Sequence, residues 1–143
     1  MRRAQKILRA GEWPGEASLS VTLDFDRRYR RRLRFCADQG AEILLDLSEA
    51  IHIRDGDALL LEDGSLVAVH AAAEQLLEIS APSPDLLIRL AWHLGNRHLS
   101  AQFLPGAIRI LHDHVIADMV HGLGGTAETK TAPFDPEPGA YHG

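Results

Sequence analysis

The chain has 143 residues, of which 45% are hydrophobic, 24% charged and only 6% aromatic. This balance is typical of a globular protein and excludes collagen, coiled coil and mucin. Fifteen Lys and Arg against twenty Asp and Glu give a formal net charge of -5, so the chain as a whole is not built to hold polyanions. A single cysteine, Cys36, excludes an intramolecular disulfide, and no apolar run approaches the roughly 18 residues of a membrane helix, so we expect a cytoplasmic protein without membrane contact.

The first half of the chain has the pattern of strands. Apolar residues alternate with polar ones through much of residues 18–70, and no helix signal interrupts them. Asp63-Gly64 stands between two apolar runs at residues 58–61 and 66–69, which is a strong hairpin signal. We therefore expect an all-β amino-terminal domain over residues 1–73, joined to the rest by a short linker around residues 71–75.

The second half mixes strands and helices. A strand is expected at residues 76–79, and the Pro-rich break that follows precedes a helix over about residues 85–94, stopped by Gly95-Asn96. Pro105-Gly106 predicts a hairpin of residues 101–104 and 107–111. Asp113 caps a second helix that Gly124-Gly125 ends. With a final strand near residues 129–134, the order is βαββαβ over residues 74–134, and residues 135–143 are expected to form a flexible tail.

Histidines are the most informative residues for function. The chain has eight, six of them in its second half. Without accompanying thiolates, imidazoles suit Ni²⁺, Cu²⁺ or Zn²⁺. In an extended segment His112 and His114 project to one side of Asp113, as a chelating pair would. His114, Asp118 and His121 repeat at helical spacing. Any one of these histidines could equally be a solvated surface residue. The metal-binding hypothesis therefore depends on the several histidines taken together.

Other functions leave weaker signals. The chain contains no HExxH, Gly-x-Ser-x-Gly, Gly-rich phosphate loop or CxxC motif. A hydrolase with a His-bound metal stays open as an alternative, with Asp113 or Asp118 as the general base near the histidines. A second alternative is an interaction or RNA-binding module built on residues 27–34, where six of eight residues are arginine. Because the chain is acidic and this run holds one tyrosine, we expect protein docking there and no nucleic-acid partner.

Cys36 follows a strand Phe and is expected to pack as a small hydrophobe.

Several motifs together resemble a known family. Residues 95–98 read Gly-Asn-Arg-His, and residues 112–115 read His-Asp-His-Val, followed by Met119. This order and spacing is similar to the metal-binding domain of UreE, the urease accessory protein. The Arg-Asp-Gly-Asp run at residues 54–57, with the acidic hairpin turn after it, resembles that family's amino-terminal domain, and residues 133–137 resemble its carboxy-terminal segment. The resemblance covers nearly the whole chain.

The resemblance implies a cytosolic nickel metallochaperone and not an enzyme. It implies an α+β chain in which a β-domain like the peptide-binding domain of a heat-shock co-chaperone precedes a ferredoxin-like domain that dimerises head to head. In that family the histidine of the Asn-Arg-His motif holds nickel on the dimer axis, which corresponds here to His98. Histidines at the start of the second helix add peripheral sites and match His112 and His114. The family passes nickel to the urease apoprotein complex through an accessory GTPase. Many members end in a histidine-rich tail, whereas this chain has only His142 there, as a further ligand.

Overall fold

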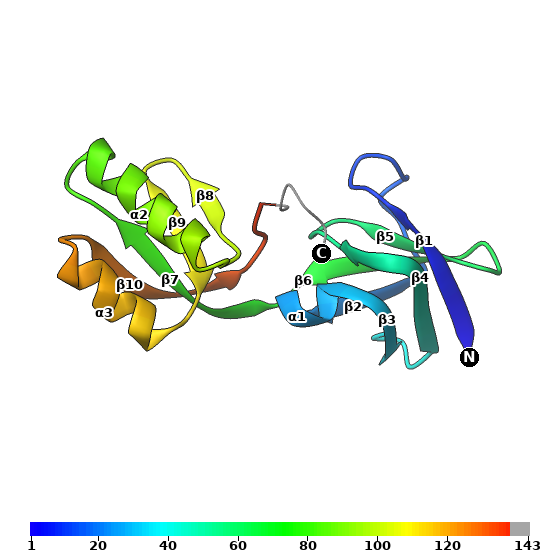
Figure 1. Cartoon of the computed structure of the whole chain (residues 1–143). Coiled ribbons are helices and arrows are strands. Elements are labelled where there is room, and N and C mark those ends of the chain that lie inside the picture. Colours follow the sequence, from blue (N-terminus) through cyan, green and yellow to red (C-terminus); the bar gives the residue numbers. More distant parts are fainter. Residues whose placement is uncertain (138–143) are drawn as a thin grey trace. The chain divides into compact units, whose positions relative to one another are not determined.

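The computed structural model describes residues 1–137 and divides the chain between Ala72 and Ala73 into two compact units. Figure 1 shows a unit built mainly of strands and a unit in which helices accompany a sheet. Among the described residues, no helix is both long and apolar enough to cross a membrane. The expected order, a β-domain followed by an α+β domain, is confirmed.

The first unit is a single sheet of six strands. Its elements are β1 (Arg2–Leu8), β2 (Leu19–Leu23), α1 (Phe25–Arg28), β3 (Tyr29–Cys36), β4 (Glu42–His52), β5 (Ala58–Leu61) and β6 (Leu66–Ala71). The strands lie in the order β2-β6-β5-β1-β4-β3. The pairs β1/β4 and β2/β6 are parallel and the other neighbours antiparallel. The hairpin predicted from Asp63-Gly64 is confirmed as β5 and β6.

The core of this unit is lined by alternate residues of β2, β3, β4, β5 and β6, and β1 contributes Ala4. On β3 and β4 the inward pairs are Phe35 with Ile43 and Leu33 with Leu45. Asp38 of the β3–β4 turn also reaches β2: its backbone N donates to the Ser20 carbonyl, and its carboxylate accepts from the Ser20 hydroxyl at 2.7 Å. The sheet therefore folds around one apolar interior.

The second unit has the predicted βαββαβ order. Its elements are β7 (Ala73–Ser80), α2 (Pro84–Asn96), β8 (Gln102–Leu104), β9 (Ala107–Leu111), α3 (His114–Gly122) and β10 (Thr126–Pro133). The strands lie in the order β10-β7-β9-β8, and all neighbours are antiparallel. This is the order of a split βαβ sheet, in which β9 lies between the parallel strands β7 and β8. The expected final strand is confirmed as β10.

Both helices of the second unit pack on one face of its sheet. The inward residues of β7 and β9 alternate along their strands, and the helices supply apolar residues one turn apart. The buried members of this core are Leu77, Ile79, Leu90, Leu94, Ile108, Ile110, Ile116 and Val120. The helices consequently hold their ends, where the candidate metal ligands lie, in fixed positions on the sheet.

Three expectations about local structure were wrong, and one strand was not predicted. Residues 2–8, for which no element was predicted, form β1. Residues 25–28 form a helical turn in a region where no helix was expected. The residues expected to form a linker are almost entirely strand, because β6 ends at Ala71 and β7 begins at Ala73. Helix α2 also continues through Gly95 and Asn96, which we expected to stop it.

Residues just beyond β10 are held in place. The backbone N of Asp135 donates to Gln102 Oε1 at 3.1 Å, and the backbone N of Glu137 donates to the Ala101 carbonyl at 2.9 Å. Pro136, between them, is buried. These contacts fix residues 135–137 beside β8, where a flexible tail was expected. Residues 138–143 lie outside the described part of the chain.

Candidate metal centre

His98 occupies an unusual backbone position at the end of α2. Its φ is 59°, which places it in the left-handed region; it is the only such residue other than glycine among residues 1–137. The His98 backbone N donates to the Gly95 carbonyl at 3.0 Å, and the Leu99 backbone N donates to the Leu94 carbonyl at 3.2 Å. These two bonds form a Schellman motif, in which the position of His98 is ordinarily taken by glycine. Leu99 and Leu94 pack in the same core, a contact that frequently accompanies this motif.

The conformation of His98 puts an exposed imidazole on a fixed support. A side chain in the left-handed region costs roughly 1–2 kcal/mol, and such strained positions gather at functional sites. Leu94 and Leu99 anchor the turn on either side, and His98 itself is exposed. The site can therefore receive a ligand from solvent without a change in the helix.

His112 and His114 stand on either side of the cap of α3. The expected cap is confirmed: Asp113 Oδ1 accepts from the backbone N of Val115 at 2.9 Å and of Ile116 at 3.3 Å. His112 is exposed, and its backbone N donates to the Gln75 carbonyl of β7 at 3.1 Å. His114 is exposed as the first residue of the helix. The backbone is extended at Asp113 but helical from His114 on, so the two histidines do not share the extended segment we expected.

The structure leaves the candidate ligands in separate places within one chain. Among residues 1–137, no three His, Cys, Asp or Glu side chains lie close enough together to hold a metal ion. His98 follows α2, whereas His112 and His114 flank the start of α3. His142 lies outside the described residues. Cys36, expected to be packed, is exposed at the end of β3.

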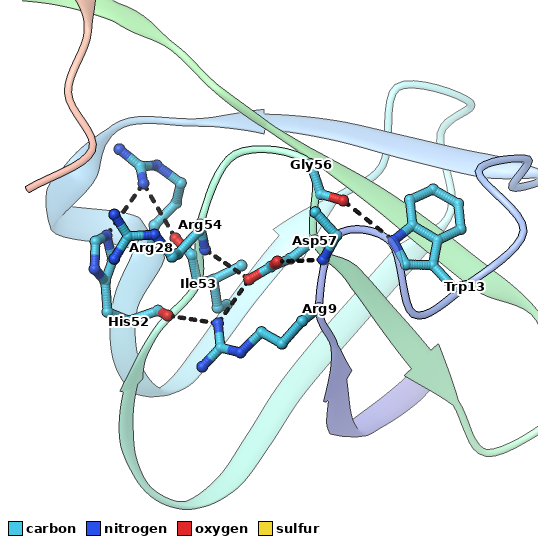
Figure 2. A network of polar contacts seen from close by, with 9 residues as sticks. Arg9, Trp13, Arg28, His52, Ile53, Arg54, Gly56 and Asp57 are labelled. Carbon is cyan, nitrogen blue, oxygen red and sulfur yellow. Dashed lines mark hydrogen bonds and ion pairs between the residues drawn. The ribbon is translucent and has the colours of Figure 1, made fainter. Parts of the chain in front are cut away.

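A buried polar network in the first unit was missed from the sequence (Figure 2). The carboxylate of Asp57, only 1% exposed, accepts from Arg9 Nη1 at 2.7 Å and from the backbone N of Ala10 and Arg54 at 3.0 and 2.8 Å. The fully buried Arg28 donates to the carbonyls of Leu23 and Ile53, each at 3.1 Å. The sequence signal for this network was the Arg-Asp-Gly-Asp run at residues 54–57, which does not indicate that Arg9, far away in the sequence, pairs with Asp57.

His52 belongs to this network and is a poor cation ligand. Burial of its ring, followed by the positive charges of Arg28, Arg54 and Arg9, lowers its pKa from 6.5 to about 4, while Asp57 acts in the opposite direction. Arg28 Nη1 lies 3.4 Å from His52 Nε2. The three guanidinium groups oppose a metal ion as they oppose a proton. We therefore place His52 in the framework of the first unit and outside the metal centre.

Comparison with known proteins assigns both units. The family model for the UreE urease accessory protein, N-terminal domain, matches residues 4–72, and that for the C-terminal domain matches residues 74–143. The chain is 55% identical, over 141 residues or 99% of its length, to two urease accessory proteins UreE. These are the proteins of Rhodopseudomonas palustris (strain HaA2) and Bradyrhizobium sp. (strain ORS 278), and the match covers 66% and 67% of their lengths. The UreE of Rhodobacter capsulatus is 44% identical over 141 residues, with 87% of its length covered.

These names describe accessory proteins, which agrees with the expectation that the chain is not an enzyme. The chain spans about two thirds of the length of the first two relatives. Both halves of the chain match the two domains of one family, in the same order and on either side of the division between its two units. The chain therefore belongs to the UreE urease accessory protein family.

Proposed function

We propose that this chain is a nickel metallochaperone that binds Ni²⁺ at His98 on the axis of a homodimer and delivers it for assembly of the urease active site. The observation that carries the proposal is the exposed imidazole of His98, held in a left-handed position at the end of α2 in a member of this family. Imidazole ligands suit Ni²⁺, and also Cu²⁺ and Zn²⁺.

A second copy of the chain would complete the site. One His98 per chain supplies two imidazoles wherever a twofold axis passes beside it. The helix that His98 follows also carries two large apolar residues that face solvent, Ile88 at 68% and Trp92 at 64% exposure. They stand four residues apart, so they lie on one side of α2. Neighbouring exposed apolar residues of this size favour association.

The remaining ligands are proposed as peripheral. His112 and His114 would bind further metal weakly, since each is exposed and near no third ligand within residues 1–137. His142 would add a ligand from the end of the sequence. Partial ligation suits a carrier, because a closed set of well-supported ligands would hold the ion too firmly to release it.

The proposed partners follow from the family's role. They are the urease accessory GTPase and the urease apoprotein complex, with the cytoplasm as the compartment. A single cysteine without an intramolecular partner fits a reducing compartment.

The test is a calorimetric titration of the full chain with Ni²⁺, with the oligomeric state followed in parallel. We expect a tightest step of one Ni²⁺ per two chains. His98→Asn and His98→Gly should abolish it, because both residues tolerate the left-handed backbone but neither offers an imidazole. His112→Ala and His114→Ala should reduce only the weaker binding.

His70→Ala serves as the matched control, since His70 is an exposed histidine on β6 of the first unit. It should leave every step unchanged. Retention of the tightest step in His98→Asn, with its loss in His112→Ala, would move the site to the start of α3 and contradict the assignment.

A further inference from the structure

Five of the six arginines of residues 27–34 separate into two groups in the structure, and the sixth, Arg27, is half-buried in α1. Arg28 is fully buried and holds the backbone of the first unit, as described above. Arg30 pairs with the carboxylate of Asp26 at 2.8 Å. Arg31, Arg32 and Arg34 are exposed on β3, with no ion pair to a carboxylate among residues 1–137. In a chain with twenty Asp and Glu, this second group is left without partners of its own.

The strand geometry arranges these arginines in a row. Leu33 and Phe35 point into the core, so Arg32 and Arg34 point to the opposite, outer face of the sheet. Their Cβ atoms are separated by about 6.7 Å, the two-residue repeat of a strand. Side chains at alternate positions of a second extended chain have the same repeat. A segment with carboxylates two residues apart therefore matches Arg32 and Arg34 one to one.

The place of β3 in the sheet also favours an extended partner. β3 is the last strand in the order β2-β6-β5-β1-β4-β3. Among the described residues, no further strand forms hydrogen bonds with its free edge. A register shift between Arg30 and Arg32 puts Arg31 at an irregularity of the strand. Positive charge protects an edge strand from pairing with a second copy of itself. The same charge attracts an acidic strand.

The charges around the arginines distinguish a peptide from a nucleic acid. Asp46, which is opposite Arg32 on β4, lies 3.7 Å from Arg3 of β1. Glu42, opposite Cys36, is exposed on the same outer face. A duplex requires a continuous basic surface, and these carboxylates interrupt it. On an extended peptide, each carboxylate can pair with one arginine without lying beside Asp46 or Glu42.

We infer that Arg32 and Arg34 of β3 form a docking site for an extended acidic segment of a partner protein. The arginines would hold its carboxylates, with Arg31 adding charge at the strand irregularity. This site lies in the first unit and does not depend on nickel binding.

The experiment uses the full chain and a blocked eight-residue peptide of alternating Glu and Thr. Cys36 is the only cysteine and is exposed two residues beyond Arg34, so a nitroxide attached to it reports on the outer face of β3. We expect the spin label to broaden the proton signals of the bound peptide, and the affinity to fall with added salt. The same peptide with Gln in place of Glu should not bind.

The variant Arg32→Gln/Arg34→Gln should weaken binding by about tenfold. The control Arg89→Gln/Arg97→Gln removes two exposed arginines of the second unit. Each double variant takes the formal net charge from -5 to -7, so they differ only in the place of the change. The control should keep the affinity within twofold.

Three results would overturn the inference. Equal loss of affinity in the two double variants would show an effect of net charge alone. Binding without broadening by the label would place the peptide elsewhere. Tighter binding of a duplex RNA than of the peptide, lost with Arg32→Gln/Arg34→Gln, would make this a nucleic-acid surface.

Discussion

At the scale of single residues, His98 combines a backbone role with its proposed metal role. Replacing it with Gly or Asn should leave the free energy of unfolding of the second unit within about 1 kcal/mol, because both residues accept a left-handed backbone. His98→Val should lower that free energy by about 1–2 kcal/mol, since a β-branched residue is strained at this φ. Urea unfolding in a Trp13→Phe background, where Trp92 is the only tryptophan left, measures this unit.

The same substitution at His112, which lacks a positive φ, is the control. His112→Val should change the unfolding of the second unit much less than His98→Val. If Gly and Val at position 98 cost the same, the left-handed conformation does not determine the stability of the turn.

His52 makes the stability of the first unit depend on pH. Its pKa is about 4 in the folded chain and 6.5 as the ordinary value, so the unfolded chain binds more protons between these pH values. The contribution of neutral His52 to the free energy of unfolding is fully present above about pH 6.5, and it is lost as the pH falls towards 4. The loss is about 2 kcal/mol once partial screening of the half-buried ring by solvent is included.

This dependence can be isolated with His52→Gln, which removes the titrating group. Urea unfolding at pH 7 and pH 4.5, in a Trp92→Phe background so that Trp13 reports on the first unit, should show a smaller loss in the variant. Parallel losses in the two proteins would contradict the role of His52.

At the scale of secondary structure, Gly125 controls how α3 joins β10. A Cβ at this position would lie 2.8 Å from a methyl of Leu90, 2.9 Å from a methyl of Val120 and 3.2 Å from the Ser80 carbonyl. Gly125→Ala should therefore lower the free energy of unfolding of the second unit by about 1–3 kcal/mol. A Cβ at Gly122, the last residue of α3, meets nothing within 4 Å.

The matched variant Gly122→Ala should leave this free energy unchanged or raise it by up to about 1 kcal/mol. Thermal unfolding followed by Trp92 fluorescence in the Trp13→Phe background compares the two variants. An equal effect of both substitutions would mean that the helix adjusts its position on the sheet.

How far the sequence predicts these elements depends on the range of the interactions that form them. The hairpin at Asp63-Gly64 and the cap at Asp113 depend on a few neighbouring residues, so their patterns were sufficient. Strand β1 pairs in parallel with β4, with paired residues 41 positions apart, and only Ala4 within β1 is buried. The local pattern of β1 therefore carries little signal. The four residues of α1 are too few to show a helical period.

The identity of the metal ligands stays a prediction, whereas the backbone geometry of the candidate residues is seen only in the structure. The motif at residues 95–98 singled out His98, yet its left-handed backbone follows from the packing of Leu94 and Leu99 across the turn. No local pattern contains that information when the residue is not glycine. Cys36 was placed inward because it follows Phe35, although strand alternation puts it on the outer face.

At the scale of the whole molecule, the proposed metal site requires association. Ile88→Glu or Trp92→Glu should convert the proposed homodimer to monomers at micromolar concentration, because each places a charge among the exposed apolar residues of α2. Thr22→Glu, an exposed position on β2 of the first unit, introduces the same charge and should leave the dimer intact. Sedimentation velocity, with and without Ni²⁺, distinguishes the species. A wild-type chain that stays monomeric with Ni²⁺ would contradict the proposed dimer.

The end of α2 also has an electrostatic consequence for a bound cation. The aligned peptide dipoles of this 13-residue helix leave about half a negative charge at its carboxyl end, where His98 begins the next turn. Arg97, exposed at the cap of α2, brings an opposing positive charge to the same place. A metal ion at His98 would be attracted by the one and repelled by the other. The rate at which Ni²⁺ dissociates then depends on Arg97, which is not itself a ligand. Arg97→Gln should lower that dissociation rate.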